Sequence, residues 1–306
     1  MLIEKLYVHA GRPHLDNAYC AFIAETLGGK TIRVNTLPED VDVFNYIGII
    51  AADIGGGVYD HHGYDTPKRK DGYTHCAASL MWKWFGIDVV KELFPTCQSP
   101  DKIAKRIDRE ILSTIAAYDN DEGPDGIYTI YQEANSFLPT WNESSRTMEE
   151  AFQDMVDFAK KITVRVGEKA ISVQQAEPIV TKALSKMENG IIVLPQFVPW
   201  QAYVIRNKDA RFVVFPSDRG GWNLQGVPVG SGMRTVRCSF DKKWLGKAGA
   251  EAEELWHNMT FCHPGNFMAA FTTKHSAINA AKHLMRIDTG FWSSHPPLHA
   301  MESGNS

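Results

Sequence analysis

The chain has 306 residues, of which 44% are hydrophobic and 22% charged, an ordinary globular composition. No apolar run approaches the length that spans a bilayer, and the N-terminus lacks the basic region and long apolar core of a secretory signal. The five cysteines form no C-x-x-C pair, which argues against a disulfide framework and against a thiolate zinc cluster. We therefore expect a cytoplasmic protein with reduced cysteines and no membrane partner.

The net charge of −4 is unevenly distributed along the chain. Residues 1–186 carry 20 basic and 27 acidic residues, whereas residues 206–247 carry 9 basic and 3 acidic residues. An acidic half that binds metal and a locally basic half would suit an anionic substrate. A solvated charged surface explains the same counts equally well.

The first half of the sequence alternates short apolar runs with helical patterns. Strands are predicted at residues 6–8, 31–35 and 47–52, and helices at 18–27, 77–85, 101–118, 148–166 and 173–187. Asn17 is the predicted N-cap of the first helix. In the helix at 101–118 one face is formed by isoleucines four residues apart: Ile103, Ile107, Ile111 and Ile115. Strands that alternate with helices are typical of a parallel sheet.

The second half is rich in β-branched and aromatic residues, with frequent Gly and Pro. Strands are predicted at residues 191–194, 203–205, 211–215, 223–225 and 235–238, and a closing helix at 274–286. We predict an α/β protein with a parallel-sheet domain at residues 1–187 and a smaller mixed α+β domain at 188–290. Residues 291–306 are expected to form a frayed tail.

Candidate metal ligands gather where the predicted strands of the first half end. Asp53 follows an apolar strand and precedes three glycines, and Asp60, His61 and His62 close the same stretch. His9, His14 and Asp16 surround the start of the first helix, and Asp119 lies at the end of another. A lone His or Asp is usually structural, but this grouping favours a site for Mn, Fe, Zn or Co.

These motifs, in this order, resemble the motif set of the DHH phosphoesterases. The set is His9-x4-His14-x-Asp16, then Asp53-Ile-Gly-Gly, then Asp60-His61-His62, then Asp119. Within that superfamily the chain is most similar to the Myg (melanocyte-proliferating-gene) family, whose opening motif carries a second His where His14 stands. The family's D-x-G-G-x-Y-D and D-H-H motifs are compressed here, so that residues 59–62 serve for both.

The likeness continues into the second half of the chain. It covers Pro199-Trp200 and residues 212–216, 222–228 and 261–267. The last of these stretches resembles the family's F-x-H-x-x-G-F motif, with Asn266 where the family has Gly. Asn is the residue next most tolerant of positive φ.

The resemblance implies a DHH-type domain with two divalent ions, most often Mn, with Mg, Co, Zn or Fe as other possibilities. It implies that His9, His14 and Asp53 hold one ion and that Asp16, His61 and Asp119 hold the other, with Asp53 bridging. The remaining candidates are catalytic: His62 either supporting the metal ligands from behind or facing the phosphate, Asp60 orienting a histidine, and His263 contacting substrate. The implied activity is that of a metal-dependent phosphodiesterase, specifically a 3′–5′ exoribonuclease.

Arginines of the second half are candidates for phosphate contacts, because guanidinium binds phosphate in a bidentate manner. Arg206, Arg219 and Arg237 represent this group, although a surface charge is the commoner role of any single arginine. Two alternatives stay open for the function. The first is a phosphoesterase acting on small nucleotides or pyrophosphate, and the second is a non-catalytic nucleic-acid-binding protein with a structural metal. The expected partner is thus RNA or a nucleotide phosphoester.

Overall fold

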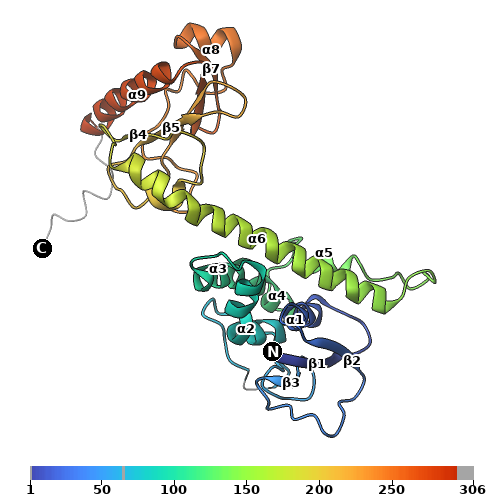
Figure 1. The fold of residues 1–306 in the computed structure, drawn as a ribbon. Helices are drawn as coiled ribbons and strands as arrows, with labels where there is room; N and C mark the ends of the chain where they lie inside the picture. The colour runs from blue at the N-terminus through green and yellow to red at the C-terminus, as the bar shows by residue number, and fades with distance from the viewer. Residues whose placement is uncertain (1, 64–65, 295–306) are drawn as a thin grey trace, which may run out of the picture. The chain divides into compact units, whose positions relative to one another are not determined.

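The structure is a computed structural model that describes residues 2–63 and 66–294 (Figure 1). The chain divides into two compact units, Met1–Ile171 and the residues from Ser172 onward. This division falls inside the longest helix, α6 (Met148–Leu184). The boundary predicted from the sequence, between residues 187 and 188, follows the end of that helix and stays a prediction.

A three-stranded parallel sheet organises the first unit, as the strand–helix alternation predicted. The strands are β1 (Ile3–His9), β2 (Lys30–Val34) and β3 (Gly48–Ala51), in the order β2-β1-β3. The helix α1 (Leu15–Thr26) connects β1 to β2 and packs against both strands (Figure 1). Its side chains are buried from Leu15 to Ala24, because α1 lies between the sheet and the other helices of the unit.

Helices complete the first unit. They are α2 (Ala77–Leu93), α3 (Pro100–Ile107), the π-helix η1 (Asp108–Leu112), α4 (Ser113–Asp119) and α5 (Ile130–Asn135), followed by the first part of α6. The predicted helix at 101–118 is therefore confirmed, with a wider π turn in its middle. All four predicted isoleucines are at most 2% exposed. A strict four-residue spacing drifts around an α-helix, and the wider turn of η1 offsets that drift.

The second unit is built on a five-stranded mixed sheet in the order β4-β5-β6-β8-β7. The strands are β4 (Ile191–Val193), β5 (Phe212–Pro216), β6 (Trp222–Gly226), β7 (Met259–Cys262) and β8 (Met268–Phe271). Only β4 and β5 are parallel. Three helices accompany the sheet: α7 (Gln201–Val204), α8 (Gly249–Leu255) and α9 (Lys274–Ser294).

Two predicted strands of the second unit are wrong. Residues 203–205 do not form a strand, because the segment turns into α7 and buries Trp200 and Val204 four residues apart. Residues 235–238 make only an isolated antiparallel bridge between Val236 and Pro228, which is held by one backbone hydrogen bond on each side, Val229 N–H to the Thr235 carbonyl and Arg237 N–H to the Val227 carbonyl. The strands β7 and β8 were not predicted; both are only four residues long and β8 contains two alanines.

Some helix ends also differ from the prediction. The two helices predicted at 148–166 and 173–187 are one continuous helix, α6. The N-cap of α1 is His14, and Asn17 instead occupies the third helical position, where its Oδ1 accepts a hydrogen bond from the His14 amide (3.2 Å). The helix α2 continues beyond Gly86 because its buried face extends through Val89 and Val90.

The closing helix is longer than predicted. It reaches residue 294, and the rest of the predicted tail, residues 295–306, lies outside the described residues. In the part of the chain that the structure describes, no helix combines the length and the apolar character needed to cross a bilayer.

Candidate metal centre

Two neighbouring parallel strands deliver the first group of candidate ligands. His9 is the last residue of β1, Asp53 follows the end of β3, and His14 caps the N-terminus of α1. The carboxyl ends of parallel strands meet at one edge of the sheet, so these residues converge there. Asp53 has a φ of 59°, and its backbone N–H donates to the Tyr59 carbonyl (3.0 Å). The turn thus fixes the carboxylate at the sheet edge.

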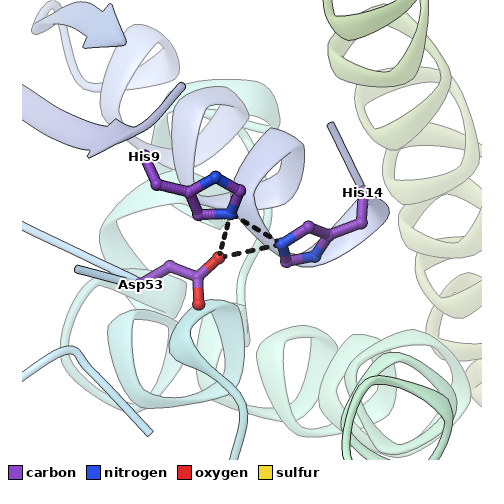
Figure 2. A group of neighbouring side chains, drawn as sticks. All are labelled: His9, His14 and Asp53. Carbon is purple, nitrogen blue, oxygen red and sulfur yellow. Dashed lines mark hydrogen bonds and ion pairs between the residues drawn. The ribbon is translucent and has the colours of Figure 1, made fainter. Parts of the chain in front are cut away.

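The three side chains present one atom each to a common point (Figure 2). Asp53 Oδ2 lies 3.1 Å from His9 Nε2 and 3.2 Å from His14 Nε2, and the two imidazole nitrogens are 2.8 Å apart. Two ligands bound at right angles about 2.1 Å from one ion lie about 3.0 Å apart. The triangle therefore has the dimensions of one face of a metal coordination sphere.

Unsatisfied buried atoms support this interpretation. Asp53 Oδ2 and His14 Nδ1 are buried and have no hydrogen-bond partner in the described part of the chain, although both lie close to charged neighbours. Buried polar atoms normally have partners. A cation within the triangle would satisfy the carboxylate oxygen, and nitrogen with oxygen donors suits a divalent transition metal. The residues thus fit a metal ion.

A second group adjoins the first through Asp53. Its other oxygen, Oδ1, lies 3.2 Å from His61 Nε2, which is also 3.1 Å from Asp119 Oδ2 and 3.8 Å from Asp16 Oδ2. The six residues expected to bind metal therefore form two linked groups, of which Asp16, His61 and Asp119 are the second. A third group that could hold a metal, Asp53, His61 and His62, overlaps both and includes His62, which the sequence predicted as catalytic. Asp53 contributes one carboxylate oxygen to each group.

Neighbouring groups hold the imidazoles in one orientation. His9 Nδ1 lies 2.8 Å from the Ala10 carbonyl, and His61 Nδ1 lies 3.1 Å from Asn120 Oδ1. The amide of Asn120 donates to two backbone carbonyls, which fixes its oxygen toward His61. Each Nδ1 therefore carries the proton when the ring is neutral, and each Nε2 offers its lone pair to the centre.

The carboxylates are anchored as well. Asp16 is fully buried and accepts hydrogen bonds from the Ala77 and Ala78 amides (3.0 and 2.7 Å) at the N-terminus of α2. The helix dipole favours negative charge at this position. The Tyr131 hydroxyl donates to Asp119 Oδ1 (2.9 Å) and leaves Oδ2 toward His61. These partners lie in other helices, and no sequence pattern pointed to them.

Asp60 and His62 form a pair at the exposed side of the centre. Asp60 Oδ1 lies 2.6 Å from His62 Nδ1 and also accepts from the His62 amide, while Oδ2 accepts from the Gly56 amide. The side chain of His62 is 65% exposed, and its Nδ1 lies 3.8 Å from Asp53 Oδ1. Asp60 thus orients a histidine that faces solvent beside the buried groups.

The electrostatics of the metal-free centre favour protons on the histidines. Burial opposes their charge, yet the carboxylates of Asp119 and Asp53 raise the pKa of His14 to about 10 and that of His61 to about 11. The histidines in turn lower the pKa of Asp119 to about 2 against the effect of burial. Burial, with Asp119 and Asp53 nearby, raises the pKa of Asp16 to about 7. A bound cation would replace these protons.

A hollow of about 350 Å³ opens onto this centre. Besides the metal-ligand candidates and His62 it is lined by Arg12, Pro13, Tyr131 and Asn135, none of which the sequence singled out. Arg12 lies in the loop between His9 and His14 and is the only Lys or Arg among the lining residues. The one signal in the sequence that could have pointed to Arg12 is its position, as a charged residue inside the motif that contains His9 and His14.

The other sequence candidates lie in the second unit. His263 and Arg219 line the same groove of about 920 Å³, which runs over β6 and β8 and is walled by phenylalanines. Arg206 is exposed. Arg237 donates to the carbonyls of Ile205, Asn207 and Ala210, so most of its guanidinium is already engaged. Asn266 has a φ of 58°, the conformation for which glycine or asparagine is suited.

Comparisons with known proteins identify the family of the chain. A family model named MYG1_exonuc, described as an uncharacterised protein family (UPF0160), matches residues 5–285. The MYG1 protein YER156C of Saccharomyces cerevisiae is 22% identical over 321 residues, covering 91% of this chain and 95% of the yeast protein. The crystal structure of an uncharacterised Helicobacter pylori G27 protein matches 88% of this chain and 93% of its own, with 11% identity and a TM-score of 0.20. On the extent of the family match, the chain belongs to the MYG1_exonuc family.

Proposed function

We propose that this protein is a metal-dependent phosphodiesterase of the DHH type that removes nucleotides from RNA in the 3′ to 5′ direction. The observation that carries the proposal is the pair of linked His/Asp groups that share Asp53. The family's name, MYG1_exonuc, supports a nuclease-like activity. The basic segment at residues 206–247 suits a polyanionic substrate.

Two divalent ions, with manganese expected, would be held by the six buried or half-buried ligand candidates. His9, His14 and Asp53 would hold one ion, and Asp16, His61 and Asp119 the other. Paired ions supply a water of lowered pKa and stabilise the attacking and leaving oxygens of a phosphoryl displacement. Nucleophilic side chains are then unnecessary.

Protein groups at the rim would position the substrate. His62, oriented by Asp60, faces solvent next to Asp53 and can donate a hydrogen bond to a phosphate oxygen. Arg12 can offset charge on the same phosphate from the wall of the hollow. In the second unit we assign substrate contacts to His263, Arg206 and Arg219. Arg237 can contribute only the guanidinium hydrogens that do not already bond to backbone carbonyls. We place the protein in the cytoplasm.

The test combines metal content with hydrolysis of short RNA, for the wild type and for Asp53→Asn. We expect two manganese ions per chain and stepwise removal of 3′ nucleotides in the wild type. Asp53→Asn should lose most bound metal and at least about a thousandfold in turnover, because one side chain serves both groups. Asp88→Asn, on the exposed surface of α2, is the matched control.

Each contrary outcome points elsewhere. If the protein binds two ions but does not hydrolyse RNA, small nucleotides or pyrophosphate become the expected substrates. RNA binding without turnover, unchanged by Asp53→Asn, would indicate a binding protein with a structural metal. A chain that binds no divalent ion would overturn the proposal.

A further inference from the structure

A second pocket adjoins the hollow over the metal centre, in the loop and helix that follow Asp119. Its volume is about 310 Å³, and it shares two lining residues, Tyr131 and Asn135, with the hollow. The other lining residues come from the end of α4, the segment that follows it and the start of α5, and include Tyr118, Asp121 and Asp125. The shared side chains make the two spaces adjacent, so a molecule bound at the metals could extend into this pocket.

The aromatic wall of this pocket is fixed in place. The Tyr118 hydroxyl donates to the Pro124 carbonyl (2.9 Å), and the Tyr131 hydroxyl donates to Asp119 (2.9 Å). The two rings are stacked with 24° between their planes and 6.4 Å between their centroids. Gly123 lies against the Tyr118 ring, where a Cβ would come within 2.8 Å of Cζ. The rings are therefore held ready for a planar ligand.

The polar lining selects against a phosphate. None of the described residues that line the pocket is Lys, Arg or His, and two of them, Asp121 and Asp125, are carboxylates. These groups repel an anion but accept hydrogen bonds from sugar hydroxyls and exocyclic amino groups. Asn135 offers both a donor and an acceptor, and no hydrogen bond to its side-chain amide is found in the described part of the chain. Such a mixture of aromatic faces and neutral or acidic acceptors matches a nucleoside.

We propose that this pocket binds the nucleoside attached to the phosphate that is cleaved at the metal centre. The inference rests on the proposed phosphodiesterase function, because the metal centre defines where that phosphate lies. The base packs against the tyrosine wall, Asn135 hydrogen-bonds to it, and the acidic loop accepts from the sugar. Arg12, across the shared hollow, faces the phosphate.

The kinetic test compares a substrate that can place a base in this pocket with one that has no base. The substrates are a diadenosine dinucleotide and its abasic counterpart, in which both riboses lack the base, and the variants are Asn135→Ala and Tyr118→Leu. We expect each variant to raise KM for the dinucleotide about three- to tenfold, the worth of one hydrogen bond or one stacked ring. The kcat/KM for the abasic dinucleotide should stay within twofold. Gln175→Ala, on the exposed surface of α6, is the control. Equal losses on both substrates would overturn the nucleoside assignment.

A binding measurement separates this inference from the proposed function. Adenosine binding to the metal-free protein is followed by saturation-transfer NMR, with inorganic phosphate as a competitor. We expect saturation transfer to the base protons of adenosine in the wild type. Asn135→Ala and Tyr118→Leu should each reduce this signal at least threefold. Inorganic phosphate should not displace the adenosine. If the wild type hydrolyses neither substrate, the phosphodiesterase proposal fails and this measurement still decides the pocket. Adenosine signals that are absent, or unchanged in both variants, would overturn the site.

Discussion

The two oxygens of Asp119 have different partners, and this makes Tyr131 a positioning residue. Oδ1 accepts from Tyr131 (2.9 Å) and lies 3.0 Å from His14 Nδ1, whereas Oδ2 faces His61 (3.1 Å). Without the hydroxyl, Oδ1 loses one of these two neighbours, and the carboxylate is held less firmly toward the centre. We expect Tyr131→Phe to lower manganese affinity about tenfold, as for other groups that orient metal ligands.

Titration calorimetry with manganese measures this affinity directly. Tyr128→Phe is the control, because its hydroxyl bonds to Glu133 and its side chain is 70% exposed. An unchanged affinity in Tyr131→Phe would show that Asp119 does not need the hydroxyl.

The raised histidine pKa values predict how the metal-free protein responds to pH. His14 and His61 have folded pKa values of about 10 and about 11, above the ordinary value of 6.5. A group whose pKa is higher in the folded than in the unfolded state stabilises the folded protein fully at pH values below its unfolded-state pKa. This stabilisation is lost as the pH rises through the folded-state pKa. Chelator-treated protein should therefore need less urea to unfold at pH 9.5 than at pH 6.5.

Metal should reverse this trend, because a cation binds the deprotonated rings and its affinity increases with pH. With manganese added, the urea midpoint should rise from pH 6.5 to pH 8. His257→Gln is a suitable control, since that histidine is exposed and lies beside Glu253 in the second unit. A metal-free protein whose stability increases between pH 6.5 and 9.5 would contradict the assigned proton positions.

At the residue scale, the sequence was informative where chemistry is carried by short local motifs. His9, His14 and Asp16 lie within one turn region, and His61 adjoins His62, so their grouping is visible without a fold. The residues that orient them are not local. Ala77 lies 61 positions from Asp16, and Tyr131 lies 12 positions from Asp119, in the next helix. Only tertiary structure brings such partners together.

At the element scale, close packing explains why a glycine, Gly167, lies inside the continuous helix α6. The sequence suggested a break near this residue, yet a Cβ here would lie 2.4 Å from the Phe94 ring. Close packing therefore accounts for the glycine. We expect Gly167→Ala to destabilise the protein by about 1 kcal/mol, because overpacking costs about 1–3 kcal/mol and exceeds the gain of about 1 kcal/mol in helix propensity.

Urea unfolding at constant pH measures this change. Ser172→Ala, exposed on the same helix, should be neutral or slightly stabilising. Adding Phe94→Leu should recover part of the loss in Gly167→Ala, since the two side chains share one space. A more stable Gly167→Ala variant would mean that the ring moves aside freely.

Periodicity predicted the long elements and failed for the short ones. The buried stripe of α3 to α4 and the three parallel strands follow from apolar spacing alone. The strands β7 and β8 have four residues each, and their pairing in the sheet comes from partners distant in sequence. Residues 203–205 were predicted as a strand because β-branched residues favour strands. Burial of Trp200 and Val204 stabilises a helical turn there instead.

At the scale of the whole molecule, the two halves of the chain differ in their charge. Residues 206–247 carry a threefold excess of basic over acidic residues, and Arg219 lines the groove that contains His263. Binding of a single-stranded polyanion releases about 0.7 counterions for each phosphate contacted. An RNA substrate that engages several of these arginines therefore binds with a strong dependence on salt, whereas a mononucleotide does not.

We predict that the logarithm of RNA affinity falls against the logarithm of salt concentration with a slope of about −2 or steeper, equivalent to three or more phosphate contacts. Fluorescence anisotropy of a labelled ten-nucleotide RNA, with the Asp53→Asn variant to prevent turnover, gives this slope. Arg219→Gln should make it shallower by about 0.7, because one contact is lost. Arg165→Gln, an exposed arginine of α6 paired with Glu168, should leave it unchanged. A flat dependence on salt would mean that the arginines of the second unit do not follow an RNA backbone, and it would favour a small phosphoester as the substrate.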